Sequence, residues 1–230
     1  MQLQNGTLLQ GGKYKIETVL GQGGFGITYL ATQTLTDKKV AIKEFFFKEY
    51  CERDNVSGTV TVPTTSKKKF VEKFQKKFLK EAKIISDLNH KNIIRVLDVF
   101  QENDTSYYSM EYIIGKSLAQ EINAKGKIDE TEAISIIDSI GQALSYLHER
   151  HINHLDVKPG NIMIDEKEHR TVLIDFGVSK QYDPETGDGT TTTPVGISHG
   201  YSPLEQYNTG GVNNFSPQSA QRTRPENILD

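Results

Sequence analysis

Apolar and polar positions alternate in short runs over the first half of the chain, and one longer run has helical spacing. The short runs are bounded by glycines and polar turns, which is typical of an antiparallel meander of strands. Over residues 67–88, apolar side chains recur at the spacing of an amphipathic helix. The strands expected from the short runs cover residues 14–20, 27–31, 39–42, 93–100 and 107–113. This part of the chain is therefore predicted to form a small β-rich lobe with one long helix.

The pattern changes after Gly115, where helical periodicity begins to dominate. Asp129 and Glu132 have the spacing of a capping box ahead of an apolar stripe of period near 3.6, which predicts a buried helix ending at about Arg150. The stripe consists of Ala133, Ile136, Ile137, Ile140, Ala143, Leu144 and Leu147. Beyond it come short apolar segments at 161–164 and 171–174 and a polar stretch at 181–193. We expect an α+β fold of two lobes that meet near residues 113–115.

Composition narrows the classes of function. The chain of 230 residues is 36% hydrophobic, enough for one sizeable core or two small lobes. Its 27 Lys and Arg nearly balance 30 Asp and Glu, so overall charge attracts neither nucleic acid nor an anionic membrane. The sequence has no export signal at its start, no apolar stretch long enough to span a membrane, and a single cysteine, Cys51. These features predict a cytoplasmic protein.

A glycine-rich segment follows the first long strand. Gly21, Gly23 and Gly26 have GxGxxG spacing, with Gly24 between them, and such glycines let backbone amides approach phosphate groups closely. The motif alone also fits a dinucleotide-binding fold or a plain Gly-rich hairpin. In a dinucleotide-binding fold it should open a helix, whereas residues 27–30 are typical of a second strand.

A lysine ends the next apolar strand. Lys43 closes the run Val-Ala-Ile-Lys, where a charge needs a partner or an anionic ligand, so it is a candidate phosphate-binding group. A lysine whose ammonium reaches solvent from a strand end is the alternative. Glu81, in the amphipathic helix, is the candidate carboxylate partner of Lys43.

Two polar clusters lie between apolar segments in the second half. His154, Asp156, Lys158 and Asn161 stand in one short loop, where general-base, phosphate-binding and metal-binding roles would suit them, although Asp156 could instead cap an ordinary turn. Asp175 ends another apolar run, and a Mg²⁺ ligand is the economical explanation for its carboxylate.

The order of these motifs is specific. Gly-rich loop, strand lysine, helix glutamate, HxDxKxxN and Asp-Phe-Gly follow one another as in protein kinases. Over residues 9–207 the chain resembles the catalytic domain of eukaryotic-type Ser/Thr protein kinases in the form found in bacteria. The resemblance implies an N-lobe at residues 1–112 with an insert at 45–66, and a partial C-lobe at 113–230 with an atypical tail at 220–230.

The resemblance also implies roles for these residues, with ATP and Mg²⁺ as cofactors and a protein Ser or Thr as substrate. The glycines would cover the ATP phosphates, and Lys43, paired to Glu81, would bind the α and β phosphates. Asn161 and Asp175 would hold Mg²⁺. Asp156 would accept the substrate proton, and Lys158 would neutralise charge on the transferred phosphoryl group.

Further positions match the adenine site and the catalytic loop by resemblance. Met110 would be the gatekeeper, and the backbone of Glu111 and Ile113 would face adenine. The adenine ring would lie between Ala41 and Met163. Thr28 stands where a valine usually covers adenine, and Ser198 would replace the threonine that bonds the catalytic aspartate.

Three further features depart from the family pattern. Leu155 replaces the arginine that often binds a phosphorylated activation loop, so that form of activation is not expected, and residues 190–193 are assigned no switch role. The insert at 45–66 has no assigned role. From Ala220 the sequence is polar without apolar period, which predicts a C-lobe truncated before several helices. Such a truncation would expose apolar surface, so we expect lower stability, a homodimer or a partner that covers this surface. The alternative function is a truncated nucleotide-binding pseudokinase or interaction module with little or no phosphotransfer.

Overall fold

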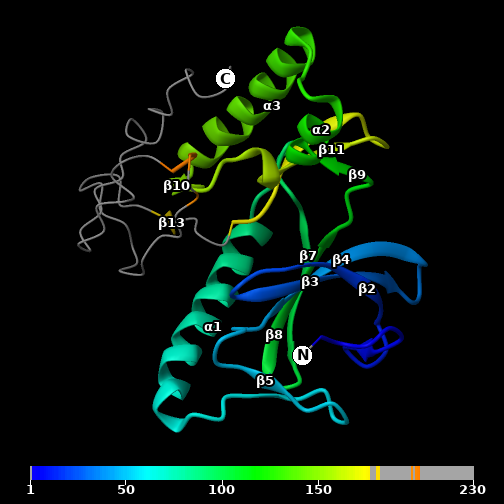
Figure 1. Cartoon of the computed structure of the whole chain (residues 1–230), viewed down its shortest axis with the longest axis vertical. Coiled ribbons are helices and arrows are strands. Elements are labelled where there is room, and N and C mark those ends of the chain that lie inside the picture. Colours follow the sequence, from blue (N-terminus) through cyan, green and yellow to red (C-terminus); the bar gives the residue numbers. More distant parts are fainter. Residues whose placement is uncertain (1, 177–179, 182–197, 199, 203–230) are drawn as a thin grey trace. The chain divides into compact units, whose positions relative to one another are not determined.

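The computed structural model describes residues 2–176, 180–181, 198 and 200–202 (Figure 1). The Thr-rich stretch 190–193, most of the segment 196–205 and the tail 220–230 lie outside these residues. The described chain divides into two compact units. The first contains the residues up to Asn89 together with Ile94–Tyr112, and the second contains His90–Ile93 and the residues from Ile113 onward. Each unit is described by itself below.

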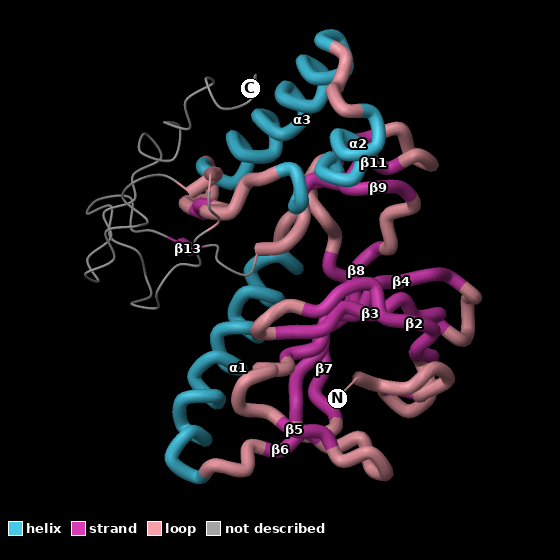
Figure 2. Tube along the Cα trace, viewed as in Figure 1, coloured by secondary structure: helices cyan, strands magenta, loops and turns pink. Residues whose placement is uncertain are grey.

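The first unit is built on a six-stranded antiparallel sheet, seen as the strand layer in Figure 2. Its order is β1-β2-β3-β4-β8-β7. The strands are β1 (Leu8–Leu9), β2 (Tyr14–Gln22), β3 (Gly26–Gln33), β4 (Lys38–Phe45), β7 (Val96–Glu102) and β8 (Thr105–Glu111). The meander expected from alternating apolar positions is present. Strands β2, β3 and β4 extend beyond the apolar runs that predicted them, whereas β7 begins three residues later and β8 ends two residues earlier than expected.

One long helix, α1 (Thr65–Ser86), packs against β7 and β8. Its buried side chains are Val71, Phe78, Glu81, Ala82 and Ile85, which recur at the spacing of one helical face. The centroid of the Phe78 ring lies 5.0 Å from that of the Tyr108 ring on β8. The predicted helix at 67–88 is therefore observed, displaced by two residues toward the N-terminus, and it buries a carboxylate together with the apolar stripe.

The insert at 45–66 contains a small hairpin that the sequence did not predict. Strand β5 (Glu52–Arg53) pairs antiparallel with β6 (Val60–Thr61). The Asp54 carboxylate accepts hydrogen bonds from the backbone amides of Val56 and Ser57, which closes the turn between the strands. The insert is thus an ordered part of the first unit.

Where the structure describes it, the second unit combines two helices with short strands. A three-stranded sheet has the order β12-β11-β9, and a separate pair joins β10 to β13. The elements are β9 (Gly115–Ser117), α2 (Leu118–Lys125), α3 (Glu130–His148), β10 (Ile152–Asn153), the 3-10 turn η1 (Pro159–Asn161), β11 (Ile162–Asp165), β12 (Arg170–Leu173) and β13 (Lys180–Gln181). The expected α+β combination of antiparallel sheets and helices is observed.

Backbone bonds explain why His90–Ile93 belong to the second unit. The Leu173 amide donates to the Asn92 carbonyl at 2.8 Å, and Ile93 forms a parallel bridge with Leu173. The Asn92 side chain donates to the Thr171 carbonyl at 2.7 Å. This short segment therefore continues the sheet beyond β12, although its place in the sequence suggested the first lobe.

Two local expectations in the second unit were wrong. The capping box lies at Ser117 and Gln120, at the start of α2, whereas the Asp129 side chain caps α3 through the Thr131 amide alone. Ile137 is 59% exposed, because the buried face of α3 consists of Ile136, Ile140, Ala143 and Leu147. A strict 3.6 period excludes a residue next to Ile136 from that face.

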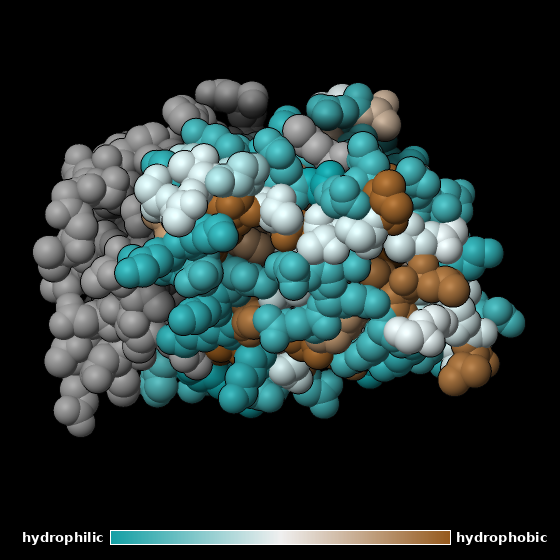
Figure 3. Space-filling model, turned by 90° about the horizontal axis from the view of Figure 1, so that it is seen from below, coloured by the Kyte–Doolittle hydropathy of each residue, from teal (hydrophilic) through white to brown (hydrophobic). Residues whose placement is uncertain are grey.

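The surface seen from below is largely hydrophilic, with hydrophobic side chains scattered between the polar ones (Figure 3). Large exposed hydrophobic residues of the described chain include Phe25, Val56 and Phe70 in the first unit and Ile134 and Ile137 in the second. None of the helices in the described part of the chain combines the length and the hydrophobicity that crossing a membrane requires.

Candidate active site

The Gly-rich loop joins β2 to β3 in the first unit. The Gly23 amide donates to the Gly26 carbonyl at 2.9 Å, and Gly21 pairs with Thr28 across the hairpin. Gly21, Gly23 and Gly24 are exposed. A Cβ at Gly26 would lie 2.7 Å from the Glu44 carbonyl oxygen and would clash with it, so this position requires glycine. Because a strand follows the loop, the helix that a dinucleotide-binding motif should open is not formed.

Lys43 and Glu81 face each other within the first unit. Lys43 Nζ lies 3.9 Å from Glu81 Oε1 and 5.8 Å from the centre of the Tyr108 ring. The Tyr108 hydroxyl donates to Glu81 Oε1 at 3.5 Å. Both charged side chains are mostly buried, so each stabilises the other against the cost of leaving water. The helix glutamate and the strand lysine are brought together, as their motif order suggested.

The residues matched to the adenine site are divided between the units. Ala41 is buried on β4 and pairs with Met110 on β8, while Glu111 ends β8 and binds the Arg95 amide through its carboxylate. Thr28 pairs with Lys43. In the second unit, Ile113 is buried, and Met163 is half-buried on β11 between Val172 and Ser117. Their adenine roles stay predictions.

His154 supports the loop that carries Asp156, Lys158 and Asn161 from inside the second unit. Its Nδ1 accepts from the Asp156 amide at 3.3 Å, and its Nε2 lies 3.2 Å from the Ile174 carbonyl. The ring contacts that of Phe176, with centroids 4.6 Å apart. Burial lowers the pKa of His154 against the opposing effect of Asp175. The histidine is therefore neutral, with its proton on Nε2, and links the loop to the Asp-Phe-Gly segment.

The Asp156 carboxylate is the centre of a polar cluster. Its Oδ1 accepts a hydrogen bond from the Ser198 hydroxyl at 2.6 Å. Its Oδ2 accepts from Asn161 Nδ2 at 2.8 Å and lies 2.9 Å from Lys158 Nζ. Lys158 also donates to the Ser198 hydroxyl at 2.8 Å. Two donors from the same loop, Lys158 and Asn161, and one from 42 residues further along the chain, Ser198, thus fix the orientation of one carboxylate.

The loop geometry depends on two residues with left-handed backbone. Leu155 has φ 64° and Asp175 has φ 60°, a region that non-glycine residues seldom occupy. The first turns the chain between His154 and Asp156. The second follows Ile174, whose amide donates to the Asn161 carbonyl at 2.9 Å. Asp175 is exposed, so its carboxylate can reach a ligand.

The donor chemistry fits Mg²⁺. Asn161 uses its amide nitrogen on Asp156, which leaves its carbonyl oxygen as the group suited to a hard cation, and Asp175 supplies a carboxylate. Among the described residues, no group of three or more His, Cys, Asp or Glu could hold a metal ion alone. Mg²⁺ commonly shares one or two protein ligands with phosphate oxygens and water, so this small donor set fits an ion bound together with a nucleotide.

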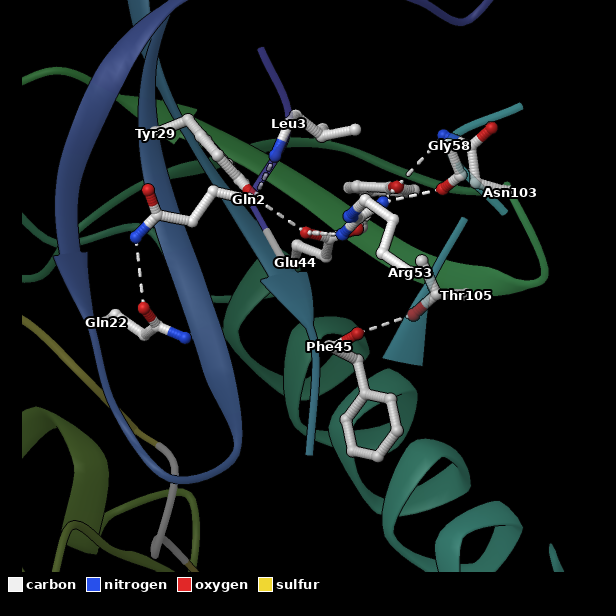
Figure 4. A network of polar contacts seen from close by, with 11 residues as sticks. Gln2, Leu3, Gln22, Tyr29, Glu44, Phe45, Arg53, Gly58, Asn103 and Thr105 are labelled. Carbon is white, nitrogen blue, oxygen red and sulfur yellow. Dashed lines mark hydrogen bonds and ion pairs between the residues drawn. The ribbon is translucent and has the colours of Figure 1, made fainter. Parts of the chain in front are cut away.

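Sequence reasoning missed a buried cluster on the other side of β4. Glu44, the residue after Lys43, is fully buried and bonded to Tyr29 and Arg53 (Figure 4). A signal was available, because a glutamate inside an apolar strand must have a partner. The identity of that partner could not be read, since Arg53 lies in the insert.

Comparison with known proteins places this geometry in a family. The family model described as the protein kinase domain matches residues 14–205. Serine/threonine-protein kinase PrkC of Bacillus subtilis is 33% identical over 91% of this chain and 27% of its own length. Serine/threonine-protein kinase pkn3 of Myxococcus xanthus is 32% identical over 80% of this chain and 31% of its own length.

A solved structure supports the same placement. The apo form of PpkA-294 matches with a TM-score of 0.70 and 26% identity over 76% of this chain and 62% of that one. The chain spans about a quarter of the length of the curated relatives that it matches first. Since the family model covers most of the sequence and its motif residues form the clusters described above, this chain belongs to the protein kinase domain family.

Proposed function

We propose that this chain transfers the γ-phosphoryl group of ATP to a serine or threonine hydroxyl of a protein. The observation that carries the proposal is the Asp156 cluster, in which Ser198, Lys158 and Asn161 hold one carboxylate in a fixed orientation. Such positioning, more than covalent chemistry, is what phosphoryl transfer requires of a protein.

The catalytic loop would act on the substrate hydroxyl. Asp156 would orient that hydroxyl and accept its proton, while the hydrogen bond from Ser198 keeps the carboxylate from rotating. Lys158, 2.9 Å from the same carboxylate, would neutralise charge on the transferred group. A lysine at this position supports Ser/Thr rather than Tyr as substrate, by resemblance to the family.

The first unit would bind the phosphates. Lys43, oriented by Glu81, would contact the α and β phosphates, and the backbone amides of Gly21–Gly26 would cover them. Asn161 and Asp175 in the second unit would hold Mg²⁺, which when bound neutralises charge on the phosphate oxygens.

The adenine ring would be bound by the family's usual positions. Thr28, Ala41 and Met163 would contact the ring, Met110 would limit its depth, and the backbone of Glu111 and Ile113 would hydrogen-bond its edge. The proposed N-lobe is residues 1–112 and the proposed C-lobe begins at 113. A cytoplasmic location is part of this proposal, because ATP is the donor.

Incubation of the chain with γ-labelled ATP, Mg²⁺ and a general protein substrate tests the proposal. The expected product is label on phosphoserine and phosphothreonine after acid hydrolysis, with none on phosphotyrosine. Binding of ATP without any transfer would overturn the proposal in favour of a nucleotide-binding interaction module. A product labelled on tyrosine, or on a small molecule alone, would contradict the substrate class.

A further inference from the structure

Glu44 is a buried charge beside the proposed phosphate-binding lysine. It follows Lys43 on β4, so its side chain points to the opposite face of the sheet. It is fully buried, and a carboxylate in that position is costly unless it is paired. Its Oε1 accepts from the Tyr107 hydroxyl at 2.6 Å, and its Oε2 accepts from the Tyr29 hydroxyl at 2.8 Å.

Arg53 supplies the positive charge that this carboxylate needs. Its Nη2 lies 2.6 Å from Glu44 Oε2, and its Nη1 donates to the Gly58 carbonyl at 2.7 Å (Figure 4). The Arg53 side chain is only 3% exposed. Burial alone lowers the pKa of the guanidinium, but the charge and hydrogen bond of Glu44 reverse this effect and the net pKa is raised. The guanidinium therefore keeps its positive charge in the folded protein.

The same insert reaches the Gly-rich loop by a second route. The Phe46 amide donates to the Phe25 carbonyl at 3.1 Å, and the Lys48 amide donates to the Gly24 carbonyl at 3.0 Å. The rings of Phe25 and Phe47 have centroids 4.6 Å apart. The insert thus binds the Gly-rich loop through the backbone carbonyls of Gly24 and Phe25 and through the Phe25 side chain.

Other contacts anchor the insert on the rest of the first unit. The Val60 amide donates to the Asn103 carbonyl at 2.8 Å, and the Asn103 side chain donates to the Tyr107 hydroxyl at 3.1 Å. The Thr105 hydroxyl donates to the Phe45 carbonyl at 2.6 Å. The insert is therefore attached to the turn between β7 and β8 as well as to β4 and the Gly-rich loop.

The geometry points to a role for the insert at 45–66 as a positioning element for the phosphate-binding residues, with Arg53 as its key residue. Arg53 fixes Glu44, which fixes the end of β4 where Lys43 lies, and the segment leading to Arg53 holds Gly24 and Phe25. This inference rests on the proposed function, since it concerns how strongly the same site binds ATP. Arg53 acts through Glu44 and is not itself a ligand of the nucleotide.

Substitution of Arg53 in the full chain tests this role against a purely structural one. Arg53→Met removes the polar contacts of the side chain, including those with Glu44 and with the Gly58 carbonyl. Arg53→Lys keeps the charge facing Glu44 but loses the fork that also reaches Gly58. The matched control is Arg170→Met in the second unit, because Arg170 likewise bonds one buried carboxylate, Asp165, and one backbone carbonyl.

Four readouts separate the two roles. They are the Kd for ATP·Mg²⁺ by calorimetric titration, the KM for ATP, the KM for the protein substrate and the melting temperature. We expect Arg53→Met to weaken ATP binding by about tenfold, less than the roughly hundredfold cost of a 1 Å misplacement at a reacting centre. Arg53→Lys should weaken it by about threefold, because the charge facing Glu44 is retained. Neither should change the KM for the protein substrate.

Arg170→Met should lower the melting temperature while leaving the Kd for ATP unchanged. The inference is overturned if the folded Arg53 variants bind ATP within twofold of the wild type, or if Arg170→Met weakens ATP binding as much as they do. If Arg53→Met does not fold, Arg53→Lys decides by the same criteria. A wild type that binds ATP without phosphotransfer contradicts the proposed function but leaves the Kd comparison valid, whereas a wild type that binds no ATP overturns both.

Discussion

At the scale of single residues, His154 connects the stability of the second unit to pH. It is fully buried and its pKa is lowered from the ordinary value of 6.5, first by burial. A group with a lowered pKa binds fewer protons in the folded chain than in the unfolded one, so its contribution to stability is complete above pH 6.5 and is lost as the pH falls below it. His90 and His148 shift in the same direction because of burial.

We therefore predict that the free energy of unfolding falls as the pH is lowered from about 7 toward 5, with a contribution from His154 of up to about 1.4 kcal/mol per pH unit. His154→Tyr keeps an aromatic ring near Phe176 and removes this titration. Chemical denaturation across the pH range should show a flatter profile for the variant. A variant profile as steep as that of the wild type would contradict the assignment.

Ser198 gives a second prediction at this scale. Its hydroxyl donates to Asp156 and accepts from Lys158, so Ser198→Ala should lower kcat by about tenfold or more, as expected for loss of a hydrogen bond to a charged group. The KM for ATP should not change. Ser198→Thr keeps the hydroxyl and should retain most of the wild-type kcat. The prediction fails if Ser198→Thr and Ser198→Ala have the same kcat.

The sequence predicted part of this residue-level picture and missed part of it. Asp156, Lys158 and Asn161 could be read as a site because polar groups are unusually dense there between apolar segments. The partners of Glu44 could not, because Arg53 lies nine residues away in the insert and Tyr107 lies 63 residues away. Long-range pairing of this kind leaves no period in the sequence.

At the scale of elements, two glycines show opposite demands on the backbone. A Cβ at Gly115, in β9, would lie 1.8 Å from the Ile164 carbonyl oxygen on the neighbouring strand. Gly141, inside α3, has open space where a Cβ would project. The sequence marked Gly115 as a break in the pattern, while the strand that approaches it appears only in the fold.

Gly115→Ala should therefore destabilise the chain by about 3 kcal/mol or more, as expected for a backbone clash that forces the strands apart. Gly141→Ala is the control and should stabilise it by up to about 1 kcal/mol through helix propensity. Denaturant titration of the two variants measures both effects. Equal stability of Gly115→Ala and the wild type would show that β9 does not approach β11 as described.

Strand and helix positions were predicted better than caps and ends. Periodic apolar runs identified β2, β3, β4, α1 and α3, since burial of one face imposes a period on the sequence. The capping box at Ser117 and Gln120 was not predicted, because no long apolar stripe follows it to indicate a helix. The hairpin of β5 and β6 was missed because its strands are two residues each, too short to show alternation.

At the scale of the whole molecule, the proposed reaction draws on both units. Lys43 and Glu81 belong to the first, and Asp156, Asn161 and Asp175 belong to the second. If the chain acts as a protein kinase, loss of the Asp156 carboxylate should greatly reduce phosphoryl transfer. Nucleotide binding relies on other residues and should persist. The two activities should therefore separate in one variant.

The most direct test compares phosphotransfer by the wild type, Asp156→Asn and Asp138→Asn at saturating ATP·Mg²⁺. Asp138 is an exposed carboxylate on α3 and serves as the control. The account predicts that Asp156→Asn loses about 10²-fold to 10⁴-fold in kcat, as expected for removal of a general base, and still binds ATP. Asp138→Asn should match the wild type. Equal phosphotransfer by Asp156→Asn and the wild type would contradict the central claim.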